Sequence, residues 1–244
     1  WAKGRFRGEQ MLYHSERIYG IDISKYQHVY KRRVYGIDWG NLRITRLGHT
    51  ADRNALGAVD YPVSFVYIKS TEGLTVFNPY YTQDVRAARR YGFPVGAYHF
   101  FSTRPAMSQA DYFLKKSRLQ KGDLPPMLDV ELSDRRIAAM GGRDVLFREM
   151  LVWLKEIGRR SGTTPIIYVS QDFVNRYMPF APEELKAYPV WVARYGEYKP
   201  YVHLLYWQLS PDGRVRGIQG DVDLDVFNGS EEQFKRYLRT QTVK

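Results

Sequence analysis

Two acidic residues, with a single residue between them, lie in the stretch "LPPMLDVEL" at residues 124–132. Alternate residues of a strand point to the same face, so Asp129 and Glu131 share a face, with backbones about 6–7 Å apart. Each ionised carboxyl then disfavours ionisation of the other, and one of them can keep a proton near neutral pH. Hydrolysis of a glycosidic bond needs a proton donor beside a carboxylate. An isolated D-x-E also occurs on solvated strands, but this one closes an apolar run that begins after two prolines.

Further acidic residues lie in two other apolar runs. Asp22 interrupts "YGIDI", where a buried carboxylate costs stability unless it is paired, hydrogen-bonded or used. Asp223 lies in "GDVDLDVF", in which Asp221, Asp223 and Asp225 alternate with apolar residues and share one face. The same alternation fits a solvent-facing edge strand. A Ca²⁺-binding loop would need flanking Gly and Glu positions that are absent, so no metal site is predicted.

The elements that position these residues can be read from hydrophobic patterning. Helical periodicity covers residues 79–91, 106–120 and 143–160. Eight short apolar runs are strand candidates: 18–23, 64–70, 95–101, 126–132, 165–170, 189–195, 203–209 and 222–227. Strands alternating with helices predict parallel pairing, and the last three runs lie too close together for full helices between them.

The pattern therefore predicts an α/β fold: an irregular TIM-like (β/α) barrel with eight strands and fewer than eight helices, roughly (β/α)5(β)3. An open doubly wound sheet is the alternative, but no Gly-rich phosphate loop follows the first strand. Residues 1–17 are interpreted as a basic arm or tether and 18–244 as a single barrel domain. Segment 28–62 is interpreted as a long decorated loop.

In a parallel barrel, functional residues gather at the carboxyl ends of the strands. We therefore expect Asp22, Asp129, Glu131 and Asp223 to meet at one mouth. His99, inside an apolar strand, is interpreted as structural. Other polar or aromatic residues at or near the strand ends are Lys69, Glu72, Tyr98, Tyr168, Ser170, Trp191, Arg194, Trp207 and Gln208.

Composition limits the partners and the location of the protein. The formal net charge of +11 favours polyanionic partners, but the basic pairs are dispersed, which argues against a nucleic-acid binder. No apolar run approaches the roughly 18 residues of a membrane span. The chain begins at Trp1 rather than Met, so we expect a trimmed chain whose export signal has been removed.

Several stretches together resemble the glycoside hydrolase family 25 lysozymes, the N-acetylmuramidases of the Chalaropsis type, over residues 18–239. They are "YGIDISKYQ", "IDW", "FVYIKSTEG", "FNPYYTQDVRAARRYGFPVGAYHFF", "LPPMLDVE", "PIIYVS", "VWVARY" and "WQLSPDGRVRGIQGDVDLDVF". Individually several are weak, but their order and spacing are highly specific.

This resemblance implies an eight-stranded irregular barrel that cleaves the β-1,4 bond between N-acetylmuramic acid and N-acetylglucosamine in peptidoglycan. It implies that Glu131 is the general acid and that Asp129 orients the substrate acetamido group, while Asp22 and Asp223 complete the acidic floor. The implied substrate-binding residues are Tyr98, Tyr168, Trp191, Trp207, Lys69 and Gln208. A monomer without cofactor or metal is expected, either secreted or in the cell envelope or periplasm, with peptidoglycan glycan strands as its partner.

Some points stay open at the level of sequence. The i, i+2 carboxylate spacing falls between the separations of retaining and inverting pairs, and we favour assistance by the substrate acetamido group. A barrel that binds peptidoglycan or chitin-type glycans without turnover is the alternative function. Tyr26 stands where many family members have Trp, and Asp225 where many have Asn. The insertion within 42–63 could cover or extend the cleft.

Overall fold

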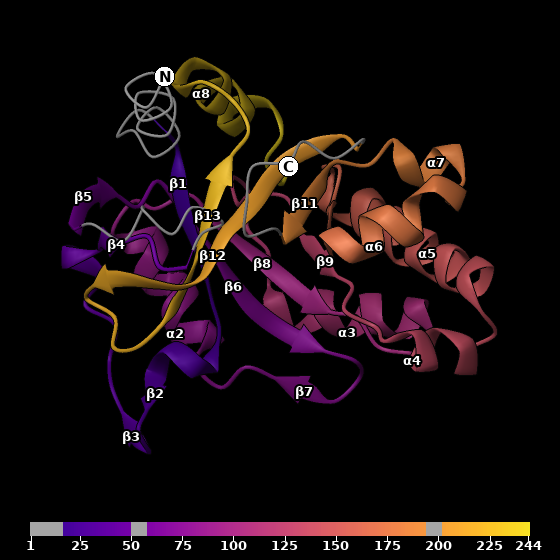
Figure 1. Ribbon diagram of the computed structural model, residues 1–244, viewed down its shortest axis with the longest axis horizontal. Coiled ribbons are helices and arrows are strands. Elements are labelled where there is room, and N and C mark those ends of the chain that lie inside the picture. The colour runs from indigo at the N-terminus through magenta and orange to yellow at the C-terminus, as the bar shows by residue number, and fades with distance from the viewer. Residues whose placement is uncertain (1–16, 50–57, 194–201) are drawn as a thin grey trace, which may run out of the picture.

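The computed structural model describes residues 17–49, 58–193 and 202–244. Its centre is a closed barrel with the strand order β11-β10-β9-β8-β6-β1-β13-β12, completed by pairing of β12 with β11 (Figure 1). The barrel strands are β1 (Tyr19–Ile23), β6 (Phe65–Glu72), β8 (Val95–Phe100), β9 (Met127–Asp129), β10 (Ile166–Ser170), β11 (Val190–Ala193), β12 (Leu204–Arg216) and β13 (Val222–Phe227). Each of them overlaps one predicted run. The predicted barrel is confirmed, and ring closure excludes the open doubly wound sheet.

Strand direction is mixed, because β13 runs antiparallel to both of its neighbours, β1 and β12. The other barrel neighbours pair in parallel. The start of β13 therefore lies at the same end of the barrel as the carboxyl end of β1, and Asp223 is the direct partner of Asp22 across this pair. The reversal brings an acidic residue from the last strand to the mouth formed by the parallel strands.

Helices cover the outside of the barrel and one of its ends. The described residues include α2 (Tyr81–Arg90), α3 (Ala106–Ser117), α4 (Asp134–Ala139), α5 (Arg143–Ser161), α6 (Gln171–Arg176), α7 (Glu183–Lys186) and α8 (Glu231–Thr240). The three predicted helices correspond to α2, α3 and α5 and are confirmed. In α8, Phe234 packs against Phe65 and Phe227, so this helix covers the end at which the parallel strands begin (Figure 1).

Segment 28–62, which we predicted to be a long decorated loop, contains regular secondary structure. It contains a hairpin of β2 (Val29–Tyr30) and β3 (Arg33–Val34), then β4 (Arg43–Arg46) and β5 (Ala58–Pro62). Strand β12 continues beyond the barrel, and β4 pairs with this extension while β5 pairs with β4. The described part of segment 28–62 contains no α-helix, so the connection from β1 to β6 differs from that of a regular β/α unit. Residues 50–57, like most of the predicted arm at 1–17, lie outside the described residues.

Side-chain alternation separates two cores. The outer core lies between the barrel and its helices and includes Val66, Ile68 and Leu128. The inner core fills the barrel with aromatic side chains, including Phe65, Tyr67, Trp191 and Tyr206, all fully buried. Gly20 on β1 permits this packing, because a Cβ atom there would lie 2.2 Å from the ring of Phe65. This aromatic inner core lies directly beneath the end of the barrel that carries the polar side chains, and we call it the floor of that end.

Candidate active site

Four carboxyl groups lie together at one end of the barrel. Asp22 is the penultimate residue of β1 and lies next to Asp223, and Asp129 ends β9, with Glu131 two residues beyond it. Asp22 and Glu131 influence each other electrostatically, and the same two groups act on both Asp129 and Asp223. The structure thus brings together the four carboxylates that the strand-end argument selected.

These carboxyls lie at different depths. Asp22 and Asp129 are buried, Asp223 is half-buried, and Glu131 is exposed. Oδ1 of Asp129 is buried and has no hydrogen-bond partner among the described residues. Glu131 can therefore reach a ligand in the mouth, and Asp129 presents an unused acceptor just beneath it.

Burial and mutual repulsion hold protons on this group. Loss of water raises the pKa of Asp22 to about 7 and the pKa of Asp223 to about 9, and repulsion from Glu131 adds to both. Burial, followed by repulsion from Glu131, raises the pKa of Asp129 well above its ordinary value. The pKa of Glu131 is also raised, because surrounding protein displaces water from it. Several protons are thus available near neutral pH.

Asp22 is held by neighbouring side chains. Nε2 of Gln208 donates to Oδ2 of Asp22 over 3.2 Å, and the hydroxyl of Tyr168 donates to Oε1 of Gln208 over 3.2 Å. A hydrogen bond from Tyr98 also favours the ionised form of Asp22 and lowers its pKa. These three residues were predicted to bind substrate, and here each supports Asp22 directly or through Gln208.

A turn fixes the backbone just after Asp22. Ser24 caps the short helix η1 (Lys25–His28): its N–H donates to Oε1 of Gln27 over 2.7 Å, and its hydroxyl accepts from Tyr26. Nε2 of Gln27 donates to the carbonyl of Asp221 over 3.1 Å, which ties the turn to the residue before β13. This capping box explains why the strand stops where it does.

Lys69 supplies positive charge at the mouth. Its Nζ lies 2.8 Å from Oε2 of Glu72 and 4.4 Å from the ring centroid of Phe100. This charge favours ionisation of Asp129 and Glu131 and partly offsets the rise in their pKa values. Glu72 was noted only as a strand-end residue, and the structure places it beside Lys69.

The two predicted tryptophans lie away from the mouth. Trp191 is fully buried, with its ring 4.9 Å from those of Tyr67 and Tyr206, so it lies in the floor rather than at a surface that sugar could reach. Trp207 packs against the outer core, and Arg17 lies 5.3 Å from its ring. It faces outward because Gln208, the next residue on β12, faces inward. The predicted strand-end residue Arg194 lies outside the described residues.

Other predicted roles can be compared with their surroundings. His99 is fully buried, with contacts of 2.7 Å to Thr71 and 3.1 Å to Gln109, as expected for a structural residue. Strand β13 lies between β1 and β12, so the interpretation of β13 as a solvent-facing edge strand is wrong.

Tyr26 is 68% exposed in η1, close in sequence to Asp22, and offers an aromatic face to solvent. Within the described ranges, no group of three or more His, Asp or Glu residues could hold a metal ion.

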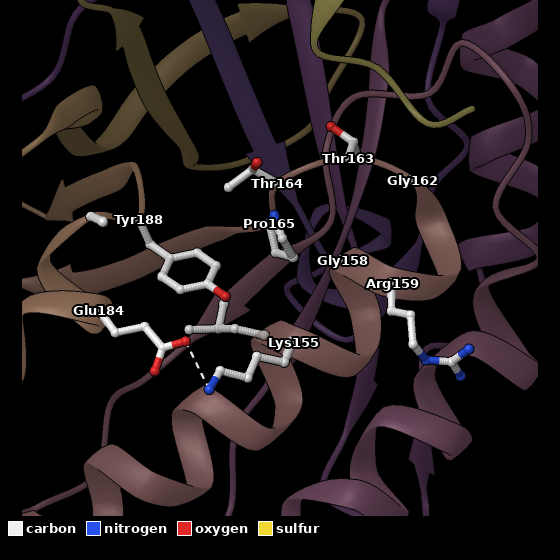
Figure 2. Close-up of a pocket in the computed structure, with 11 residues that line it drawn as sticks. Lys155, Gly158, Arg159, Gly162, Thr163, Thr164, Pro165, Glu184 and Tyr188 are labelled. Carbon is white, nitrogen blue, oxygen red and sulfur yellow. Dashed lines mark ion pairs between the residues drawn. The ribbon is translucent and has the colours of Figure 1, made fainter.

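A separate hollow of about 680 Å³ lies between α5 and α7. Figure 2 shows Lys155 and Glu184 on its wall, with Nζ and Oε1 2.7 Å apart. Thr164 and Pro165, which precede β10, also line it. It therefore lies toward the amino-terminal end of β10, whereas the carboxylates lie at the opposite end of the barrel.

No helix in the described part of the chain is both long and apolar enough to cross a membrane.

The raised pKa values predict how stability depends on pH. A carboxyl whose pKa is higher in the folded than in the unfolded protein contributes stability below about pH 4, which is lost as pH rises through the folded pKa. For Asp22 the window runs from about 4 to about 7, a loss on the order of 4 kcal/mol at about 1.4 kcal/mol per pKa unit. Urea unfolding of Asp22→Asn at several pH values should show a shallower decline than the wild type.

The exposed Asp134, whose pKa is lowered by Arg176, provides the control. Asp134→Asn should leave the decline between pH 4 and 7 in place. Equal slopes for the wild type and Asp22→Asn would show that Asp22 titrates normally in the folded protein.

Comparison with known proteins identifies relatives of the whole barrel. The model of the family described as "Glycosyl hydrolases family 25" matches residues 21–218. The uncharacterised protein YegX of Escherichia coli O6:H1 is 33% identical over 228 residues, covering 92% of this chain and 74% of YegX. Lysozyme M1 of Streptomyces globisporus is 29% identical over 229 residues, covering 87% and 68%. The crystal structure of a bacterial lysozyme from Streptomyces coelicolor superposes with a TM-score of 0.71 at 27% identity, covering 90% of this chain and 96% of that one.

Proposed function

The chain belongs to family 25 of the glycosyl hydrolases, and we propose that it is a lysozyme that hydrolyses the β-1,4 bond between N-acetylmuramic acid and N-acetylglucosamine in peptidoglycan. The observation that carries this proposal is the pairing of the exposed Glu131 with the buried Asp129 inside an acidic mouth. Relatives named as lysozymes support the same substrate.

In the proposed first step, Glu131 donates its proton to the glycosidic oxygen. The carbonyl oxygen of the substrate acetamido group attacks the anomeric carbon as the bond to the leaving oxygen breaks. Oδ1 of Asp129, which has no hydrogen-bond partner among the described residues, accepts the N–H of that acetamido group. Lys69 stabilises the negative charge that then remains on Glu131.

In the second step, a water molecule attacks the anomeric carbon while the Glu131 carboxylate takes a proton from it. The bond to the acetamido oxygen breaks, which restores the substrate group and reprotonates Glu131. Two displacements at the same carbon give net retention of configuration. Asp22, supported by Gln208 and Tyr98, contributes negative charge near the developing cation.

This mechanism predicts that the β-anomer of the new reducing end forms first. Proton NMR spectra recorded during early turnover distinguish the anomers before mutarotation mixes them. A first-formed α-anomer would rule out the retaining, substrate-assisted route, while leaving the identity of the cleaved bond unaffected.

We also propose that the enzyme acts as a monomer outside the cell or in the cell envelope, where its substrate lies. A charge of +11 suits an anionic wall. Three arginines of the paired basic motifs are already engaged: Arg89 by Asp123, Arg159 by Glu156 and Arg160 by Asp111. Arginines that are already paired with acidic side chains are poorly suited to binding the phosphates of a nucleic acid. Binding to purified cell wall should therefore exceed binding to DNA at the same salt concentration.

A further inference from the structure

Asp225 is a buried carboxyl group to which the proposed reaction assigns no role. It lies on the inner face of β13, two residues deeper in the barrel than Asp223. Its exposure is 0%, and neither of its side-chain oxygens has a hydrogen-bond partner among the described residues. A buried ionised carboxylate in that condition is far more costly than a neutral carboxylic acid.

Among the described residues, none supplies a compensating positive charge to Asp225. Its direct neighbours across the sheet are Gly20 on β1, which has no side chain, and Gln208 on β12. The indole N–H of Trp191 is close enough to lower the pKa of Asp225, although its geometry falls short of a hydrogen bond. The titratable groups that act on Asp225 or lie near it are Asp22 on β1, Asp223 on β13 and Tyr67 on β6.

Both charged neighbours are therefore acids. Burial raises the pKa of Asp225 well above its ordinary value, and repulsion from Asp22 and Asp223 raises it further. The repulsion is mutual, so an ionised Asp225 would also oppose ionisation of Asp22 and Asp223. Asp22, in contrast, has donors in Gln208 and Tyr98 that favour its charged form.

We propose that Asp225 is a positioning residue that works as an uncharged carboxylic acid, filling the floor beneath Asp22 and Asp223 so that these two carboxyls titrate without a third negative charge beside them. The proposal rests on the proposed function only for the consequence in turnover. The charge state of Asp225 itself can be tested without substrate.

The amide of Asp225→Asn has nearly the shape of the neutral acid and cannot ionise. We expect this variant to fold, to retain turnover at mildly acidic pH, and to have a higher thermal midpoint than the wild type by a margin that grows as pH rises. Both limbs of its pH–rate profile should stay where the wild type has them, because the amide and the neutral acid carry the same charge. A downward shift of the alkaline limb would show that Asp225 is charged in the wild type, since removal of a nearby negative charge lowers the pKa of an acid. Asp111→Asn is the matched control, because Asp111 on α3 is exposed and its Oδ1 lies 2.8 Å from Nη1 of Arg160, away from the carboxylate cluster.

A second measurement uses the wild-type protein and requires neither a folded variant nor an activity assay. In ¹³C NMR spectra of wild-type protein labelled at the aspartate carboxyl carbon, the Asp225 signal should keep its protonated shift above the pH at which Asp22 titrates, about 7. A signal that titrates below that pH would overturn the proposal. A folded Asp225→Asn with a large loss of turnover at every pH would also overturn it. If the wild type cleaves no peptidoglycan, the proposed function fails, but the NMR and stability results still decide the state of Asp225.

Discussion

Glu131→Gln is expected to lower the rate of reducing-end release from peptidoglycan by about two to four orders of magnitude, the usual contribution of a general acid or base. The amide has nearly the shape of the acid but cannot donate a proton to the leaving oxygen or accept one from water. Because Glu131 is exposed, the change disturbs no packed core. Binding to insoluble peptidoglycan should therefore persist, and the thermal midpoint should stay close to that of the wild type.

The control is Glu183→Gln, an exposed glutamate whose Oε1 lies 2.8 Å from Nζ of Lys186 on α7, away from the mouth. It should leave both turnover and binding unchanged. Full activity in Glu131→Gln would remove Glu131 from the chemistry. Loss of binding together with turnover would point to a role in holding the glycan.

Asp22→Asn is expected to reduce turnover by about 10²-fold or more, comparable with removal of one preorganised electrostatic group from an active site. The asparagine oxygen can still accept from Nε2 of Gln208, so the local geometry should survive while the negative charge is lost. With the folded pKa of Asp22 at about 7, the variant should be at least as stable as the wild type at pH 8. Turnover of cell-wall fragments and urea unfolding, both at pH 8, measure the two effects on one sample.

Combining activity with stability separates two roles for Asp22. A variant that is inactive but well folded supports an electrostatic role in the reaction. A variant that unfolds would show that the carboxylate is needed for the structure, as a partner of Gln208 and Tyr98. Asp111→Asn, at an exposed acid on α3 that pairs with Arg160, should change neither measurement.

The barrel could be predicted because its signals are local in the sequence. Each strand is a short apolar run, and α2, α3 and α5 each have ten or more residues, enough for helical periodicity to be visible. Helices α4, α6 and α7 have six residues or fewer and show no such pattern. Helix α8 also has ten residues but was not predicted, so length alone does not decide which helices are found. The pairing of β4 with the extension of β12 joins Ile44 to Val215, far apart in the sequence, and no local pattern in segment 28–62 indicates that partner.

The sequence could predict which residues of the candidate site share a face and an end of the barrel. It could not predict how deeply each side chain is buried. Alternation shows which strand residues share a face, and strand order brings the four carboxylates to one end. Alternation does not show how deep in the barrel a side chain lies, which is why Trp191 was named among the implied substrate-binding residues although it is fully buried in the inner core. Gln208 connects residues 40 and 186 positions away, Tyr168 and Asp22, so its supporting role is visible only in three dimensions.

Mass analysis of the soluble fragments released from purified peptidoglycan tests the central claim most directly. Reduction with borohydride before analysis marks the sugar at each new reducing end. We expect the reduced sugar to be N-acetylmuramic acid, with no new peptide ends, and we expect Glu131→Gln to release almost none. Reduced N-acetylglucosamine, or fragments with intact glycan chains and cleaved peptides, would contradict the assignment of this barrel as a muramidase.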